Sequence, residues 1–412
     1  MSTSPRHVAI IAPPTAGHLN PLQVLGAQLA RAGHAVTVVH TGEVARYIHE
    51  PGVSFAPLPD DAVGASLDTY LARLAAPTGL GGLTRMISAT ADMTARLLDG
   101  APAVLDRIKV DAVIADSAEP AGALIAQHLR IPHVVSVTGL PLLREDDVPP
   151  PFVRWRYRPD RLGRFRNRGG YGVANLLMRP IDAVVRGRRR DWNIDDAVQP
   201  LAYVAQCPRG LDYPRRDLPA HFHYGSPWRA SARAEVDLPI GDRPLVFCSL
   251  GSLQGSRKAL FASMSAACAA IGARAVIGHG GGLTPADEAA LPGQPLVRAF
   301  WPQEAVLRRC SAAILHGGFN TVLDALAAGV PIVAVPIAFE QPGTAARLAR
   351  IGAAQVITPR QLSVTRLAHA LRHVVVDPGY RQAAMRVAAE MDAVGGARAA
   401  AAIVSAALAS AP

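Results

Sequence analysis

The sequence predicts an α/β protein with two domains, each a doubly wound parallel sheet covered by helices on both faces. Apolar runs of strand length alternate with longer amphipathic segments along the 412 residues, and this alternation begins again near residue 243. Runs that are apolar throughout are typical of parallel strands, because helices bury both faces of such a sheet. We therefore expect an N-terminal domain at 1–225, a linker rich in Pro, Gly, Ser and charge at 226–243, and a C-terminal domain at 244–412.

The N-terminal half begins with a strand, a helix and a second strand, and the same unit recurs further along the chain. Gly33 follows the first of these helices, at a position where glycine commonly ends a helix because it adopts positive φ freely. The expected strands are 7–13, 35–40, 111–116 and 133–137, and the expected helices are 21–32 and 118–128.

The C-terminal half repeats this order. The expected strands are 244–252, 273–278, 295–300, 312–318 and 331–337, and the expected helices are 258–271 and 320–328. A last helical segment, at about 380–409, could complete the second domain or cross back onto the first. Two open sheets in tandem place a crevice between the carboxyl ends of their strands, and ligands of such folds bind there.

The turn after the first strand places a histidine at this crevice. Gly17 allows a tight turn, and His18 precedes the expected helix, of which Pro21 is an early residue. The imidazole could accept a proton near neutral pH, or it could cap or pack against the helix terminus. Asp116 ends a neighbouring strand, where it could orient and stabilise the imidazole or serve as the N-cap of the following helix.

A turn between a strand and a helix in the C-terminal half has the composition of a diphosphate cradle. Its donors and free backbone are supplied by His316, Gly318, Asn320 and Thr321. They lie at a helix start, where the helix dipole favours anions. Asp324 is expected in the first turn of that helix, either bonded to ribose hydroxyls or favourably placed in the dipole. An earlier turn, ending at Ser252, offers further hydroxyl donors.

Two further strand ends carry side chains suited to a nucleotide sugar. Phe300 could stack on a base while Gln303 contacts its edge, although an aromatic here could equally pack at a domain edge. Glu340 and Gln341 could hold vicinal sugar hydroxyls or belong to an acidic surface loop. The first turn lacks G-x-G-x-x-G and the chain has no G-x-x-x-x-G-K-[ST], which disfavours nicotinamide enzymes and P-loop nucleotidases.

The positive charge of the chain is concentrated in one stretch. Basic residues number 42 and acidic residues 32, and between 154 and 190 there are twelve Arg and two Asp. This concentration disfavours a general nucleic-acid binder. Aromatic residues lie among the arginines, so the stretch could be a lid or surface that docks on anionic lipid, or a solvated loop.

The composition also predicts the cellular compartment of the protein and its need for cofactors. The four scattered cysteines form no C-x-x-C pair, and no run of 18 apolar residues occurs. We expect a monomer in the reducing cytoplasm that meets a membrane, if at all, peripherally on its inner face. No tight cluster of His and Cys ligands is visible, so we expect neither a metal nor a bound cofactor.

Together these motifs resemble the inverting, nucleotide-sugar-dependent glycosyltransferases of the two-domain GT-B fold. The resemblance covers nearly the whole chain and is most specific from about 300 to 342, where W-x-P-Q, H-x-G-x-N-[ST]-x-x-[ED] and [DE]-Q follow in the family's order. Two positions depart from the family's pattern: Phe300 stands in place of its base-stacking Trp, and Asp324 in place of its ribose-binding Glu.

The resemblance implies a role for each candidate. It implies that His18 is the catalytic base and that Asp116 is its partner. The donor-binding residues that it implies are Ser252, His316, Gly318, Asn320 and Thr321 for the diphosphate, Asp324 for the ribose, Phe300 and Gln303 for the base, and Glu340 and Gln341 for the sugar. It further implies in-line attack with inversion, without a metal, and closure of the two domains.

A narrower resemblance concerns the acceptor. Segments at 116–122, 148–152, 155–157, 169–171 and 320–326 are similar to bacterial zeaxanthin glucosyltransferases of carotenoid pathways. That subgroup implies UDP-glucose as donor and a ring hydroxyl of a xanthophyll as acceptor. The alternatives are a polyketide, macrolide or phenolic acceptor, or a nucleotide-sugar epimerase of the same architecture. The expected partners are therefore a nucleotide sugar, a lipophilic small molecule and an anionic membrane surface, but no nucleic acid.

Overall fold

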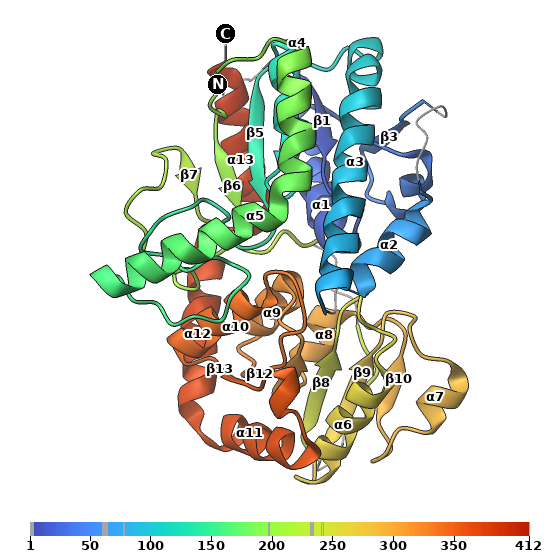
Figure 1. The fold of residues 1–412 in the computed structure, drawn as a ribbon. Helices are drawn as coiled ribbons and strands as arrows, with labels where there is room; N and C mark the ends of the chain where they lie inside the picture. The colour runs from blue at the N-terminus through green and yellow to red at the C-terminus, as the bar shows by residue number, and fades with distance from the viewer. Residues whose placement is uncertain are drawn as a thin grey trace.

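Seven parallel strands form the sheet of the N-terminal domain, which lies at the top of the computed structural model in Figure 1. The structure describes residues 4–59, 65–76, 79–196, 198–230, 235–239, 241 and 243–411. The order of the strands is β3-β2-β1-β4-β5-β6-β7. Their bounds are β1 His7–Ile11, β2 Ala35–His40, β3 Val53–Pro57, β4 Ala112–Asp116, β5 His133–Val137, β6 Tyr203–Ala205 and β7 Phe222–His223.

The helices of this domain cover both faces of its sheet. Their bounds are α1 Ala16–Arg31, η1 Gly42–Tyr47, α2 Leu67–Ala75, α3 Gly79–Arg107, α4 Ala121–Leu129 and α5 Arg161–Asp191. Alternate residues of β1 face opposite ways: Val8 and Ile10 pack in the core that includes α1, whereas Ala9 and Ile11 pack in the core that includes α3 and α4. This two-sided burial explains why the strand reads as one apolar run.

The C-terminal domain contains a six-stranded parallel sheet in the order β10-β9-β8-β11-β12-β13. Its strands are β8 Leu245–Ser249, β9 Arg274–Gly278, β10 Leu296–Arg298, β11 Ala312–Leu315, β12 Ile332–Ala334 and β13 Ala354–Val356. Its helices are α6 Lys258–Ala269, α7 Pro285–Ala289, α8 Gln303–Leu307, α9 Phe319–Ala327, α10 Gln341–Ile351, η2 Pro359–Gln361, α11 Val364–Val376, α12 Pro378–Val394 and α13 Gly396–Ala409. The predicted fold class, two doubly wound parallel sheets, is confirmed.

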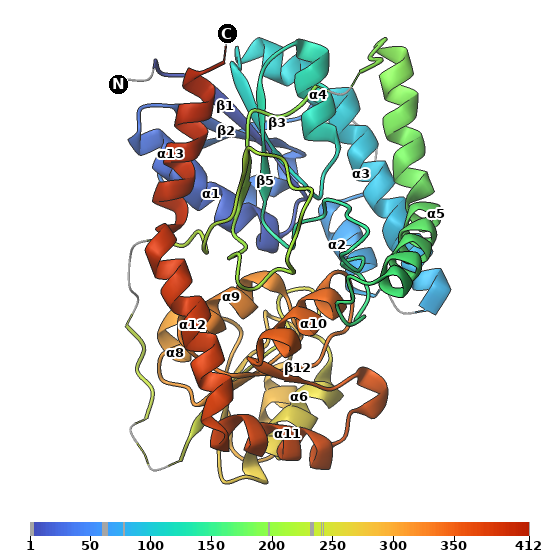
Figure 2. The same ribbon diagram turned by 90° about the vertical axis from the view of Figure 1, so that its left-hand side faces the viewer.

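The last helical segment crosses back to the N-terminal domain. Figure 2 shows α12 beside the lower domain and α13 running up beside the first sheet, with both chain ends at the top. Gly395 separates the two helices at a φ of 92°, a conformation that glycine adopts without strain. Ala397, Val404 and Leu408 of α13 then pack in the core of the N-terminal domain with α1. This settles the alternative that the sequence left open.

Several predicted elements begin elsewhere. The first helix starts at Ala16 rather than at residue 21, so His18 lies in its first turn instead of preceding it, and Pro21 lies inside the helix. The second helix starts at Ala121 rather than 118. The solvated-loop interpretation of the Arg-rich stretch is wrong for most of its length, because α5 occupies 161–191. Part of the predicted linker, at 231–234, 240 and 242, lies outside the described residues.

No single helix among the described residues is both long and apolar enough to cross a membrane. Only α12 and α13 taken together, with a 44° bend between them, have that length and composition. Both helices contribute residues to the hydrophobic cores of the two domains.

Candidate active site

His18 lies at the start of α1 in a three-membered network with Asp116 and Thr138. Its Nδ1 is 3.2 Å from Asp116 Oδ1 and 2.8 Å from Thr138 Oγ1, and the Thr138 hydroxyl lies 2.7 Å from Asp116 Oδ2. A carboxylate only accepts, so the Thr138 hydroxyl donates to Asp116 and Nδ1 of His18 carries the proton. This tautomer leaves Nε2 of His18 free to accept a proton.

The surroundings of His18 make it more basic than a free imidazole. Burial alone lowers the pKa of His18, but the charge and hydrogen bond of Asp116 outweigh burial, and the carboxylates of Glu340 and Glu119 act in the same direction. The pKa of His18 is therefore raised above its ordinary 6.5. The side chain keeps 27% of its surface exposed, which leaves room for a reacting group to approach.

Asp116 also holds the turn in which it lies. Its Oδ1 accepts from the backbone N–H of Ala118 at 2.9 Å. The interpretation of Asp116 as the N-cap of the next helix is wrong, because α4 begins at Ala121 after Pro120. One carboxylate thus fixes the loop after β4 and orients the imidazole of His18 across the sheet edge.

Glu119 is a buried acid beside this network that sequence reasoning did not single out as a site residue. Its Oε1 accepts from the Thr94 hydroxyl at 2.9 Å and from the Ala121 amide at 3.1 Å. Burial raises the pKa of Glu119 to about 7, and the charge of Asp116 adds to this rise. The sequence offered only one signal, a second acid three residues after Asp116 at a strand end.

Glu119→Gln is expected to stabilise the protein above neutral pH. Between pH 4.5 and 7 the folded protein binds a proton at Glu119 that the unfolded chain has released, so the free energy of unfolding falls as pH rises. Gln keeps the acceptor for Thr94 and Ala121 but has no proton to lose. We expect equal stability near pH 4 and a gain of about 3 kcal/mol at pH 8, measured by urea unfolding.

The control for this substitution is Glu235→Gln, at an exposed position, which should change stability little at either pH. A Glu119→Gln variant less stable than the parent at pH 8 would contradict the assignment of a raised pKa to this carboxyl.

His316 lies between two glycine turns of the C-terminal domain. A Cβ on Gly318 would lie 2.3 Å from its Nε2, and a Cβ on Gly251 would lie 2.9 Å from the ring. Burial lowers the pKa of His316 to about 4, so the ring is neutral at physiological pH. Its Nδ1 is buried without a hydrogen-bond partner among the described residues. The two glycines therefore admit a neutral imidazole at the N-terminus of α9.

Asn320 connects this turn to the N-terminal domain. Its Nδ2 donates to the Gly17 carbonyl at 2.6 Å, and its Oδ1 accepts from Gln206 Nε2 at 3.2 Å. The Gly17 carbonyl is available because its intrahelical partner would be the N–H of residue 21, and proline has none. Pro21 thus leaves the Gly17 carbonyl, one residue before His18, free to accept the bond that joins the two domains.

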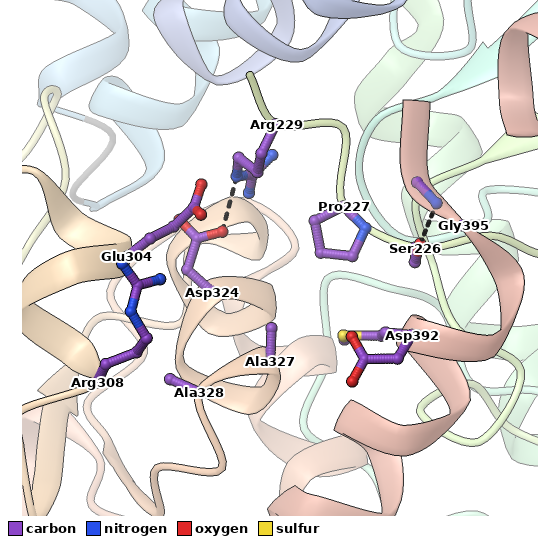
Figure 3. Close-up of a pocket in the computed structure, with 12 residues that line it drawn as sticks. Ser226, Pro227, Arg229, Glu304, Arg308, Asp324, Ala327, Ala328, Asp392 and Gly395 are labelled. Carbon is purple, nitrogen blue, oxygen red and sulfur yellow. Dashed lines mark hydrogen bonds and ion pairs between the residues drawn. The ribbon is translucent and has the colours of Figure 1, made fainter. Parts of the chain in front are cut away.

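Asp324 is fully engaged by two other side chains. Its Oδ1 accepts from Arg229 Nε at 2.7 Å and its Oδ2 from Gln303 Nε2 at 2.5 Å. Figure 3 shows Arg229 reaching from the linker to Asp324, beside a cavity of about 300 Å³. Asp324 lies in the second turn of α9, so the predicted first-turn position is wrong. Arg229 was missed because nothing in its local sequence indicates a partner 95 residues away.

The remaining predicted residues follow the strands of the C-terminal sheet, in the connecting loops or in the first turns of the next helices. Phe300 is 73% exposed and free to stack, whereas its neighbour Trp301 is anchored by a 2.9 Å bond from Nε1 to the Ile277 carbonyl. Glu340 is the N-cap residue of α10, and Gln341 Oε1 accepts from two backbone amides of the preceding loop at 2.8 Å. The other two, Ser252 and Thr321, are exposed and half-buried respectively.

Comparison with known proteins gives a consistent result. Residues 210–391 match the family model described as "UDP-glucoronosyl and UDP-glucosyl transferase". The chain is 37% identical over 352 residues to zeaxanthin glucosyltransferase of Pseudescherichia vulneris, covering 83% of this chain and 84% of that protein. It is 32% identical over 410 residues to zeaxanthin glucosyltransferase of Pantoea ananas, covering 97% and 95%.

Solved structures agree at the level of the fold. The crystal structure of CalG4, the calicheamicin glycosyltransferase, superposes with a TM-score of 0.76 at 22% identity and covers 99% of this chain and 100% of that one. The glycotransferase of kitacinnamycin gives a TM-score of 0.77 at 23% identity, with coverage of 98% and 99%. The two doubly wound domains are therefore arranged as in these solved enzymes.

Proposed function

The chain belongs to the family of UDP-glucoronosyl and UDP-glucosyl transferases, and we propose that it moves glucose from UDP-glucose to a hydroxyl group of a xanthophyll such as zeaxanthin. The observation that carries the chemical part of this proposal is the network of His18, Asp116 and Thr138, with an unprotonated Nε2 on an imidazole that is 27% exposed. The identity to two zeaxanthin glucosyltransferases supports the acceptor.

In the proposed reaction, Nε2 of His18 takes the proton of the acceptor hydroxyl as its oxygen attacks the anomeric carbon of glucose. The new C–O bond forms on the face opposite the departing diphosphate, so the configuration at that carbon inverts. The imidazolium left on His18 is stabilised by Asp116, whose oxygen already lies 3.2 Å from Nδ1. The electron pair of the broken bond leaves with UDP.

The donor is proposed to lie along the loops of the C-terminal domain. The N-terminus of α9 and the neutral ring of His316 would stabilise charge on the leaving diphosphate. Phe300 would stack on the base, and Glu340 and Gln341 would contact sugar hydroxyls. Asp324 would accept from ribose hydroxyls while Arg229 keeps it oriented. No step in this scheme calls for a metal.

The test is a transfer assay. The protein is incubated with UDP-glucose and zeaxanthin in detergent micelles, and the products are analysed by mass spectrometry. We expect a mass gain of one hexose, a β-linked product by NMR, and no gain on a carotene hydrocarbon without hydroxyl groups. Transfer to a macrolide or phenol but not to zeaxanthin would overturn the acceptor, and conversion of the donor without any acceptor would favour an epimerase.

A further inference from the structure

The first half of α5 exposes a row of large apolar side chains to solvent. Leu162 is 61% exposed, Phe165 76%, Val173 60% and Leu176 55%. These positions are separated by 3, 8 and 3 residues, which places them on one stripe of a helix that turns about 100° per residue. In Figure 1 this part of α5 projects to the left, beyond the body of the molecule. The described residues leave this stripe uncovered.

A row of arginines runs along one flank of the stripe. By the same helical geometry Arg161, Arg168 and Arg179 lie on that flank. The helix bends near Pro180, and the arm beyond it packs against α3, so its arginines do not border the stripe (Figure 1). Arg168 pairs with Asp146 at 2.6 Å. Among the described residues, Arg161 and Arg179 have no acidic partner, so their charge is available to an external anion.

Most of the aromatic residues in this stretch pack against other residues of the protein instead of facing solvent. The guanidinium of Arg166 covers the ring of Trp155 at 4.9 Å, Tyr157 stacks on Tyr213 at 5.0 Å, and Tyr171 is buried. Of the four aromatics among the arginines, Phe165 alone is exposed to solvent. The sequence-based picture of an aromatic surface is therefore replaced by a mainly aliphatic stripe with a basic flank.

A short loop connects α5 to the candidate active site. Asn167 of α5 donates to the Asp146 carbonyl at 2.8 Å, and Arg164 pairs with Asp147. Five residues along the chain from Asp146, the Pro151 carbonyl accepts from Gly343 N–H at 3.1 Å, in the first turn of α10. The α10 helix begins directly after Glu340. The exposed stripe is thus coupled through one loop to the helix that carries the proposed sugar contacts.

We propose that this surface, the α5 face formed by Leu162, Phe165, Val173 and Leu176 with Arg161 and Arg179, docks on an anionic lipid bilayer. An amphipathic helix with apolar and basic rows binds in this way: the apolar row enters the headgroup boundary and the arginines contact lipid phosphates. A second copy paired antiparallel along the stripe would bring the two basic flanks together, whereas lipid phosphates neutralise that charge. The proposal rests on the proposed function in one respect: membrane docking would deliver an acceptor that is dissolved in the membrane.

The test is flotation of the purified protein with vesicles of phosphatidylglycerol and phosphatidylcholine at low salt. We expect the protein to float with these vesicles and not with phosphatidylcholine alone. Arg161→Gln combined with Arg179→Gln should lower partitioning about 25-fold, since each arginine near the surface contributes about fivefold. Phe165→Ser with Leu176→Ser should abolish binding.

The matched controls lie on the C-terminal domain. Arg372→Gln with Arg386→Gln removes exposed charge, and Val376→Ser with Met385→Ser removes exposed apolar surface. Both pairs should float like the parent. The proposal would be overturned if the parent protein did not float with the vesicles, or if the control pairs lost binding as the α5 variants do. It would also be overturned if the α5 variants changed the oligomeric state instead of lipid binding. We expect the α5 variants to keep the parent's activity on a soluble alcohol acceptor. This measurement distinguishes a loss of membrane binding from a failure of the proposed function.

Discussion

His18→Ala is expected to lower kcat for glycosyl transfer by about 10²- to 10⁴-fold, the range that a positioned general base contributes. The variant removes Nε2, which the hydrogen bonds of Nδ1 to Asp116 and Thr138 leave unprotonated. Initial rates at saturating donor and acceptor measure the effect. His369→Ala, at an exposed position on α11, is the control and should keep the parent's rate.

The pH dependence of the rate is a second test of the role of His18. Only the neutral imidazole accepts a proton, so kcat/KM should fall as pH drops through the pKa of His18, which lies above 6.5. Asp116→Asn removes the charge that raises this pKa, and the acid limb of its profile should move to lower pH. A parental rate in His18→Ala, or an acid limb below pH 6.5 in the parent, would refute the role of the base.

The sequence predicted the sheets and the strand-end residues well because both depend on local patterns. Parallel strands appear as apolar runs, and small or polar residues that follow them lie at the carboxyl edge of a sheet. His18, Asp116 and His316 were identified on that ground. The partnership of His18 with Asp116 was expected from the resemblance, but Thr138 and Arg229 were not identified, because the contacts of His18 with Thr138 and of Asp324 with Arg229 join residues 120 and 95 positions apart. No local pattern records such a pairing.

The helix α5 illustrates a different failure. Gly169, Gly170, Gly172 and Pro180 are poor helix formers, so local propensity gave no reason to prefer a helix to the solvated loop. Packing against α3 overrides these propensities in the second half, where Ile181 is buried in a small cluster with Ile87 and Ala91. Gly170 also has a packing role: a Cβ there would lie 2.6 Å from the ring of Trp155. Glycine allows this close approach.

A buried ion cluster joins the two domains on the side of α10, and no local pattern in the sequence predicts it. Asp212 of the N-terminal domain lies 2.6 Å from Arg215 Nε and 2.9 Å from Arg347 Nε of α10. All three side chains are at most 2% exposed. The Tyr224 hydroxyl donates to Asp212 at 3.1 Å, and the Arg347 guanidinium covers the ring of Tyr213 at 4.1 Å. Two buried cations therefore share one carboxylate across the domain interface.

Asp212→Asn is expected to lower the free energy of unfolding by about 3–5 kcal/mol, because it leaves two guanidinium groups buried without a counter-charge. Arg347→Met should cost less, since Asp212 then keeps its bond to Arg215. Calorimetry should show a melting temperature about 5 °C lower for Asp212→Asn. Asp106→Asn, in the exposed pair with Lys109, is the control and should change the melting temperature little.

The effect of Asp212→Asn should also depend on pH with a defined sign. Burial alone would raise the pKa of Asp212, but Arg347 and Arg215 lower it below its ordinary value. The cluster's contribution is therefore fully present above the unfolded carboxyl's pKa of about 4, and it is lost as pH falls through the folded value. Parent and Asp212→Asn should converge in stability as the solution is acidified. A constant difference between them down to acid unfolding, or equal damage from Arg347→Met at neutral pH, would show that the carboxylate does not balance the two arginines.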